Sequence, residues 1–285
     1  MTLQPASGAG TSGGILLRQA VGARALGMGE AFAGVADDAT ALFWNPGGLS
    51  QVTGLQANAT YQAGLAESAY EQILASYCLN NLGTISLGLS LLQGGMVDLD
   101  NPDGTLKQVQ SQSDVAFSAG FGANLTPALG LGLAVKMLNS TLAEEVSAMA
   151  VAADLGALLT INEQLTVGVV LQNAGTEIKY QEEGDPLPLT ARLGAGYQVD
   201  LAEDHAGLLA VDLVKANDQD FSLNLGAEYW YAGFLALRLG YKTGSDLEGL
   251  TAGFGAHYQF LQFDYAFGLA QELSNTHKVS LSLIL

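Results

Sequence analysis

Residues 129–137 read Leu-Gly-Leu-Gly-Leu-Ala-Val-Lys-Met, and every second side chain in this stretch is large and apolar. The large side chains are Leu129, Leu131, Leu133, Val135 and Met137, and the positions between them hold Gly130, Gly132, Ala134 and Lys136. Because successive side chains of a β-strand point to opposite faces, the pattern predicts a strand with one bulky apolar face and one small or charged face.

The same alternation recurs along the chain. In 260–269, for example, one face holds Leu261, Phe263, Tyr265, Phe267 and Leu269, and the other holds Gln262, Asp264, Ala266 and Gly268. From Val52 onward the pattern predicts fourteen segments, most of them close to the length that a tilted strand needs to cross a bilayer. The predicted strands are 52–63, 70–79, 82–93, 114–124, 129–142, 147–160, 164–174, 189–199, 206–215, 221–230, 233–242, 248–258, 260–269 and 276–285.

The two faces differ in a way that favours a membrane protein. The face of glycine, alanine and charged residues is too small and too polar for a packed core, so we expect the apolar face to contact lipid and the other to line a lumen. No run of 18 apolar residues predicts a transmembrane helix. We therefore predict an all-β fold, an antiparallel transmembrane β-barrel of about 14 strands over residues 52–285. A soluble β-sandwich with the apolar face inside is the alternative.

Connection lengths predict the orientation. The even-numbered connections between predicted strands are short, such as 80–81, 126–128 and 259, whereas most odd-numbered ones are longer, above all 94–113 and 175–188. Outer-membrane barrels have short periplasmic turns and long extracellular loops. We therefore expect a bacterial outer-membrane protein with periplasmic termini and extracellular long loops, although the odd connections 143–146 and 216–220 are short.

The first 51 residues do not alternate. Residues 1–14 are rich in Gly, Ser and Thr and are expected to be flexible. Residues 15–51 are expected to form a plug in the lumen, with a helix over 35–44 that begins at Asp37 or Asp38 and ends before Pro46. Met1–Pro5 lack the basic start and apolar stretch of a signal peptide, so a chain that crosses the inner membrane would be numbered here after processing.

Charged residues at lumen-facing positions need partners, because an unpaired charge in a low-dielectric lumen is costly. These residues are Asp154, Arg192, Asp212, Glu228, Arg238 and Asp264, and the plug residues Arg24, Asp37 and Asp38 are candidate partners. The network is either a polar gate that rearranges for a ligand or a static anchor for the plug.

The net charge of −18 excludes a nucleic-acid partner, since phosphate contacts need Lys and Arg. Acidic residues concentrate in the predicted outer loops, where they should attract cations or basic protein surfaces and disfavour fatty acids as free anions. The loop residues expected to bind a partner are Asp98, Asp100, Asp103, Glu182, Glu183 and Asp185. A solvated loop surface without a partner is the simpler alternative.

No motif predicts a metal, a cofactor or catalysis. The segment 98–104 resembles a calcium loop, but Pro102 occupies the fifth position, so a turn is favoured. Gly27-Met28-Gly29 follows no predicted strand and is not a nucleotide fingerprint. His205, His257 and His277 lie in separate elements, and Cys78 has no second cysteine to pair with. We expect neither a metal nor a cofactor and predict that the protein is not an enzyme.

Two segments, Ala23–Phe32 (ARALGMGEAF) and Gly34–Ser50 (GVADDATALFWNPGGLS), resemble the start of the PorV/PorQ family, within the wider group of FadL-like outer-membrane barrels. Weaker similarities continue in order, such as Gln172–Gly175, Leu237–Tyr241 and Asp264–Phe267. The resemblance implies a fourteen-stranded barrel and an N-terminal hatch with an Asn-Pro-Ala element, which is Asn45-Pro46-Gly47 here. The residues assigned to this plug motif are Arg24, Gly27, Gly29, Asp37, Asp38, Asn45, Pro46 and Gly47.

Members of that family serve type IX secretion, where PorV-like proteins accept exported cargo at the cell surface. The resemblance therefore implies an accessory or scaffold protein that binds secreted or surface proteins through its acidic loops. One alternative is a FadL-like transporter of hydrophobic small molecules, and another is a structural surface protein that self-associates. The expected partners are membrane lipids and another protein at the cell surface or in the outer membrane, and the transporter alternative adds a hydrophobic ligand.

Overall fold

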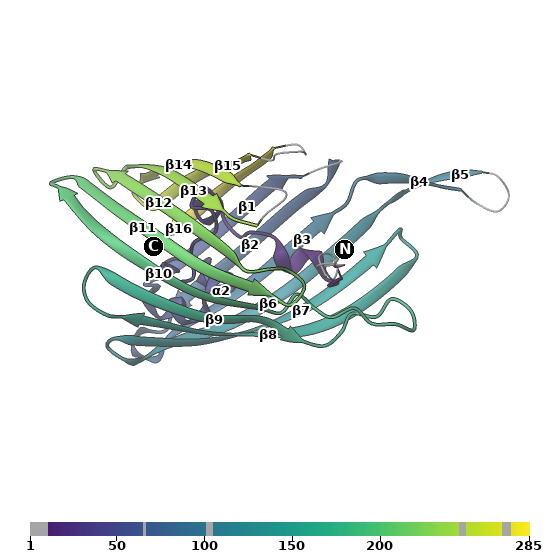
Figure 1. Cartoon of the computed structure of the whole chain (residues 1–285), viewed down its shortest axis with the longest axis horizontal. Helices are drawn as coiled ribbons and strands as arrows, with labels where there is room; N and C mark the ends of the chain where they lie inside the picture. Colours follow the sequence, from purple (N-terminus) through teal and green to yellow (C-terminus); the bar gives the residue numbers. More distant parts are fainter. Residues whose placement is uncertain (1–10, 65–66, 101–104, 245–248, 270–274) are drawn as a thin grey trace, which may run out of the picture.

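Fourteen antiparallel strands close into a barrel in the computed structural model, which describes residues 11–64, 67–100, 105–244, 249–269 and 275–285 (Figure 1). The barrel strands are β1 (Leu55–Ala63), β2 (Ala69–Cys78), β3 (Thr84–Gln93), β6 (Gln112–Thr126), β7 (Leu129–Leu142), β8 (Val146–Thr160), β9 (Leu165–Gly175), β10 (Thr190–Ala202), β11 (His205–Ala216), β12 (Ser222–Tyr231), β13 (Leu235–Lys242), β14 (Leu250–Tyr258), β15 (Leu261–Leu269) and β16 (Thr276–Ile284). The predicted fold class is confirmed, and each predicted segment overlaps one barrel strand.

Closure joins the first barrel strand to the last. β1 pairs with β16 in antiparallel register, and the backbone N–H groups of Leu55 and Leu285 each donate to the other residue's carbonyl, at 3.0 and 2.9 Å. Closing the sheet leaves no open edge in the barrel, so every barrel strand has two neighbours.

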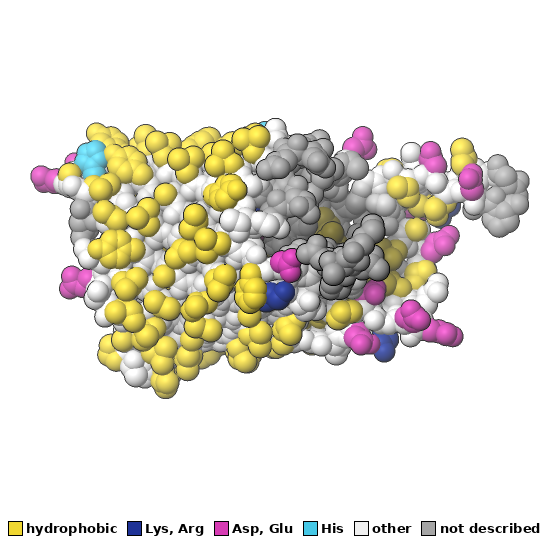
Figure 2. All heavy atoms as spheres, viewed as in Figure 1, with side chains coloured by type: hydrophobic (Ala, Val, Ile, Leu, Met, Phe, Trp, Pro, Cys, Tyr) yellow, Lys and Arg dark blue, Asp and Glu magenta, His cyan; other side chains and the backbone are white. Residues whose placement is uncertain are grey.

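The large apolar side chains face outward, as the alternation in 129–137 predicts. Leu133 and Met137 are 47% and 49% exposed, whereas Ala134 and Lys136, which point inward, are 0% and 4% exposed. Apolar side chains cover much of the barrel wall, and acidic residues gather toward the end where β4 and β5 project (Figure 2). No helix among the described residues is long and apolar enough to span a membrane.

The connections differ in length at the two ends of the barrel. At one end, called here the short-turn end, the connections include 127–128, 203–204 and 259–260. The other, the long-loop end, has connections 94–111 and 176–189. The first of these long connections was expected to be a loop, but it forms a hairpin of β4 (Met96–Asp100) and β5 (Leu106–Gln110) that projects beyond the barrel (Figure 1).

The segment before β1 lies inside the barrel. It contains η1 (Ile15–Arg18), α1 (Ala23–Gly27), α2 (Ala41–Trp44) and η2 (Pro46–Gln51). The helix predicted over 35–44 is wrong in extent, since only 41–44 are α-helical. The backbone of Ala36 has φ +22°, which interrupts a helix, and Asp38 accepts a hydrogen bond from the Thr40 N–H and so forms a turn before α2.

This plug runs the length of the lumen. Near its start, the Gly13 N–H donates to the Pro186 carbonyl at the long-loop end, at 3.0 Å. At its other end, η2 packs on β6, β7 and β8 and leads into β1 at the short-turn end. The described part of the plug therefore begins at the long-loop end and finishes at the short-turn end. The expectation that both termini share one end concerns residue 1, which lies outside the described residues, and it stays a prediction. Residues 1–10, which were expected to be flexible, lie outside the described residues.

Lumen-facing glycines allow the plug backbone to touch the wall. A Cβ at Gly132 would lie 2.1 Å from the Pro46 carbonyl oxygen, and one at Gly168 would lie 1.9 Å from that of Ala33. The small inward face of the strands is therefore filled by plug backbone over these positions rather than by water.

Candidate functional site

Arg24 of α1 is the centre of an ion-pair network between the plug and the wall. Its guanidinium donates to both carboxylate oxygens of Glu228, at 2.9 and 3.0 Å, and to Asp37 and Asp38, at 2.5 and 3.1 Å. Arg238 extends the network, with hydrogen bonds of 2.6 Å to Glu228 and 2.7 Å to Asp264. The plug and three wall strands thus meet in one charged cluster.

The remaining predicted lumen charges lie apart from this cluster. The Lys136 ammonium lies 2.6 Å from Asp154, which also accepts the backbone N–H of Asn173 at 2.7 Å. Arg192 lies 3.9 Å from Asp212, whose Oδ2 accepts two plug backbone N–H groups, from residues 32 and 33, at 3.0 and 2.9 Å. These wall carboxylates therefore hold backbone groups as well as cations.

The Asn45-Pro46-Gly47 element wedges the plug against β7–β9. The Asn45 amide donates to the carbonyls of Ala33 and Ala157, at 2.8 and 3.0 Å, and its side-chain oxygen accepts the Gly47 N–H at 3.0 Å. A Cβ at Gly47 would lie 3.0 Å from the Ala157 backbone. The close approach explains why glycine fits where the resembled family has alanine.

The two glycines of the other motif pack against β13 and β14. Gly29 has φ +62° and donates its N–H to Thr251 Oγ1 at 3.0 Å. A Cβ at Gly29 would lie 2.7 Å from the backbone nitrogen of Tyr241, and one at Gly27 would lie 3.3 Å from the Gly253 Cα. Both positions therefore admit the plug backbone where a larger residue would collide.

A cavity of about 950 Å³ lies in the half of the lumen toward the long loops. Its lining is mixed. The apolar side chains include Leu16, Leu17, Phe43, Trp44, Tyr70 and Leu92, and the neutral polar ones include Gln62, Gln112 and Asn224. Four cations also line it, and each has an acidic partner: Arg18 with Asp218, Lys136 with Asp154, Arg192 with Asp212 and Lys242 with Glu30. A space of this size suits a small organic molecule.

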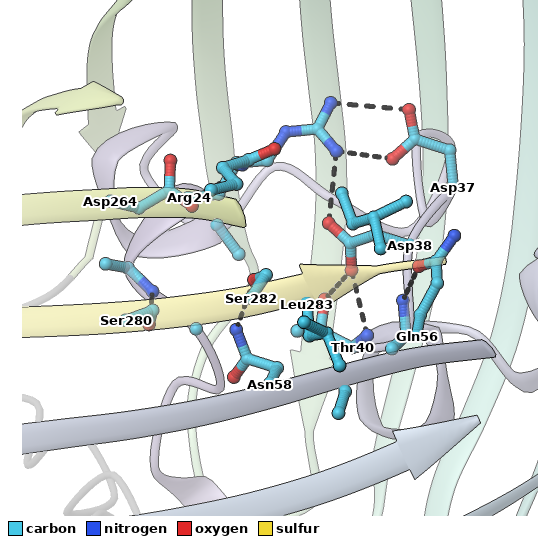
Figure 3. A pocket seen from close by; sticks show the side chains of 17 residues that line it. Arg24, Asp37, Asp38, Thr40, Gln56, Asn58, Asp264, Ser280, Ser282 and Leu283 are labelled. Carbon is cyan, nitrogen blue, oxygen red and sulfur yellow. Dashed lines mark hydrogen bonds and ion pairs between the residues drawn. The ribbon is translucent and has the colours of Figure 1, made fainter. Parts of the chain in front are cut away.

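A second cavity, of about 170 Å³, lies between the plug and β1, β15 and β16. Its lining is polar and includes Arg24, Asp37, Asp38, Asn58, Asp264 and Ser282 (Figure 3). In this view the Arg24 guanidinium points toward Asp37 and Asp38, and Asn58 of β1 donates to Ser282 of β16, at 2.9 Å. Residues of α1 line both cavities, with Leu26 in the larger one and Ala23–Ala25 in the smaller one.

Several charged residues of the lumen were not predicted to belong to its charge network. They are Arg18, Glu30, Lys136, Asp218, Lys242 and Lys278. Lys136, Lys242 and Lys278 occupy inward positions of the alternation, so the pattern could have identified them. Arg18 and Asp218 lie outside the strands and carried no such signal.

The predicted partner-binding acids lie at the long-loop end. Asp98 and Asp100 are exposed on β4, and Glu182, Glu183 and Asp185 are exposed in the connection 176–189. Asp103 lies outside the described residues. No group of three or more potential metal ligands occurs in the part of the chain that the structure describes.

Comparison with solved structures identifies similar barrels. The toluene transporter TbuX of Ralstonia pickettii matches with a TM-score of 0.65 and 12% identity, over 93% of this chain and 98% of that one. The monoaromatic hydrocarbon channel CymD matches with a TM-score of 0.63 and 14% identity, over 93% and 97%. A FadL homologue of Pseudomonas aeruginosa matches with a TM-score of 0.53 and 10% identity, over 90% and 96%.

The fold is therefore that of the FadL-like outer-membrane barrels. Comparison of the sequence gives no matching protein-family model and no matching curated protein. The resemblance to the PorV/PorQ family in particular is therefore not supported by any matching family model or curated protein.

Proposed function

We propose that the protein is an outer-membrane channel that takes up small, uncharged apolar molecules through the cavity at the long-loop end. The observation that carries this proposal is the apolar part of that cavity's mixed lining, which includes Leu16, Phe43 and Trp44, in a space large enough for such a molecule. The structures with the same fold include proteins described as a toluene transporter and a monoaromatic hydrocarbon channel, which supports the same ligand class. The long loops would then face the cell exterior.

The charges around the cavity favour an uncharged ligand. Arg18, Lys136, Arg192 and Lys242 in the lining are each paired with a carboxylate. A ligand anion that bound one of these cations would therefore have to displace its carboxylate partner. Exposed acids such as Glu182 and Glu183 at the same end repel anions further.

Tryptophan fluorescence tests ligand binding. Trp44 lines the cavity, whereas Trp230, the other tryptophan of the chain, does not. A Trp230→Phe variant should show saturable quenching by bromobenzene that toluene reverses, because bound bromine would lie beside Trp44. The matched Trp44→Phe variant should show only weak, linear quenching. Equal linear quenching in both variants would exclude a ligand site in this cavity.

A PorV-like scaffold function is the second candidate. The β4–β5 hairpin projects beyond the barrel and exposes Asp98 and Asp100, so it could contact a basic protein surface at the cell exterior. Gentle extraction followed by purification, with and without residues 96–110, tests this function. A stoichiometric partner that is lost with the hairpin supports it, and the absence of any partner from the intact protein counts against it.

A further inference from the structure

We propose that the wall formed by β16 and β1 carries an aqueous route for small hydrophilic cations, closed in this structure by Lys278 and plug residues 20–26. This route is separate from the uptake of apolar molecules. It requires the barrel to span a membrane, but it does not require the ligand site beside Trp44.

The lumen side of this wall is polar along its length. The inward side chains of β1 are Gln56, Asn58, Thr60 and Gln62, and those of β16 that face them include Ser280 and Ser282. They hydrogen-bond to one another, as Asn58 does to Ser282 at 2.9 Å and Thr60 to Ser280 at 2.8 Å. Hydroxyl and amide groups replace the contacts that a hydrated ion makes with bulk water, so such a wall suits water and small cations.

The wall joins the two cavities. Gln62 lines the cavity at the long-loop end, and Asn58 lines the one near the short-turn end. The two residues are four apart on β1, so about 13 Å of strand separates the cavities. On the plug side, Ala20, Val21 and Leu26 line the first cavity, whereas Gly22–Ala25 line the second. A single layer of plug therefore divides a continuous polar wall.

Lys278 closes that layer. Its side chain is fully buried, its ammonium donates to the Ala20 carbonyl, and it lies 5.3 Å from the centre of the Tyr70 ring. Ser280 accepts the Ala23 N–H at 2.8 Å, so two side chains of β16 fasten the plug backbone at this level. The Lys278 side chain and the fastened plug backbone therefore fill the polar wall at this level and block a path along it.

The opposite wall offers no comparable route. Against β7 and β9 the plug backbone approaches so closely that a Cβ at Gly132 or Gly168 would lie within about 2.1 Å of a plug carbonyl. Such contacts leave no room for water. Near the short-turn end, the carboxylates of Asp37 and Asp38 hydrogen-bond to Arg24 and are still 38% and 27% exposed, so an ion that passes Lys278 reaches acidic oxygens that are partly open.

Planar-bilayer recording of purified protein in KCl tests the route. We expect Lys278→Ala to raise the conductance at least roughly tenfold over the native chain, which corresponds to a barrier lower by about 1.4 kcal/mol, with a reversal potential that shows cation preference. Lys278→Arg keeps the charge and should remain closed. Lys215→Ala removes a lysine whose ammonium bonds to the Gln219 carbonyl at the barrel exterior, and it should match the native chain.

Cysteine accessibility gives a second measurement that does not depend on the Lys278 variants folding. In a Cys78→Ser background, a cysteine in place of Ser280 should react with a membrane-impermeant cationic thiol reagent added at the short-turn side. With Lys278 present, it should be shielded from the long-loop side. Reaction from neither side, or Lys278→Ala barrels that fold and conduct no better than the native chain, would overturn the proposal.

Discussion

Arg24 in the plug and Glu228 on β12 form a bidentate ion pair, with Nε 3.0 Å from Oε2 and Nη2 2.9 Å from Oε1. The same guanidinium holds Asp37, and the same carboxylate holds Arg238. Two parallel hydrogen bonds between a guanidinium and a carboxylate fix the relative orientation of the two groups in addition to pairing their charges. The pair therefore sets where α1 sits in the lumen.

Replacing Glu228 with Gln should destabilise the protein by roughly 3–5 kcal/mol, because it leaves two buried guanidinium groups short of a carboxylate. Urea unfolding of the barrel in lipid vesicles measures this loss. The double variant Arg24→Met with Glu228→Gln should lose less than the two single changes together. Additive losses would show that the pair does not couple the plug to the wall.

Gly132→Ala should displace the plug, since its Cβ would lie 2.1 Å from the Pro46 carbonyl oxygen. We expect a loss of about 1–3 kcal/mol, which is typical of overpacking, together with faster proteolysis of residues 11–54. Gly207→Ala is the matched control, because its nearest neighbour would lie at an ordinary 3.4 Å. Equal protease resistance in both variants would contradict the wedge contact.

The start of the plug should loosen in acid. Partial burial disfavours a charged Asp218, but hydrogen bonds from Arg18 and Ser12 outweigh it and hold the pKa of this loop carboxyl below its ordinary value. The stabilisation is therefore fully present above the ordinary pKa of an aspartate and is lost as the pH falls through the lowered value. A spin label at Ile15→Cys, in a Cys78→Ser background, should become mobile as the pH falls through the lowered pKa of Asp218.

Asp218→Asn supplies the control for this pH dependence. The variant should show a mobile label at Ile15 already at neutral pH and no further change in acid. A label whose mobility follows pH equally in both proteins would mean that another group controls the anchor.

Leu133→Arg tests the membrane-facing wall. Leu133 is 47% exposed in the middle of β7, where an arginine should cost roughly 2–4 kcal/mol if the side chain contacts lipid. Leu106→Arg changes a more exposed leucine, at 67%, on the projecting hairpin and should cost almost nothing. Refolding into vesicles followed by urea titration compares them. Equal stability of the two variants would remove the argument for a lipid contact.

Much of the barrel could be predicted because its strands follow a local rule. The bounds predicted for β7, 129–142, are those observed, since alternation over so many residues fixes both face and length. The hairpin of β4 and β5 was missed because Asp98, Asp100 and Pro102 read as a loop. The extent of α2 was wrong because the wall, through contacts such as Gly34 against Ala195, bends the plug where local propensity favours a helix.

The sequence by itself determined the number of barrel strands, which face of each of them is apolar and which positions carry charge toward the lumen, because the alternation repeats every two residues. Only the tertiary structure decided that Arg24 meets Glu228 across 204 positions, that glycines of the wall make room for plug backbone, and that Lys278 reaches Ala20. Contacts of this kind depend on how a non-repeating plug threads a closed barrel, and no local pattern records that path.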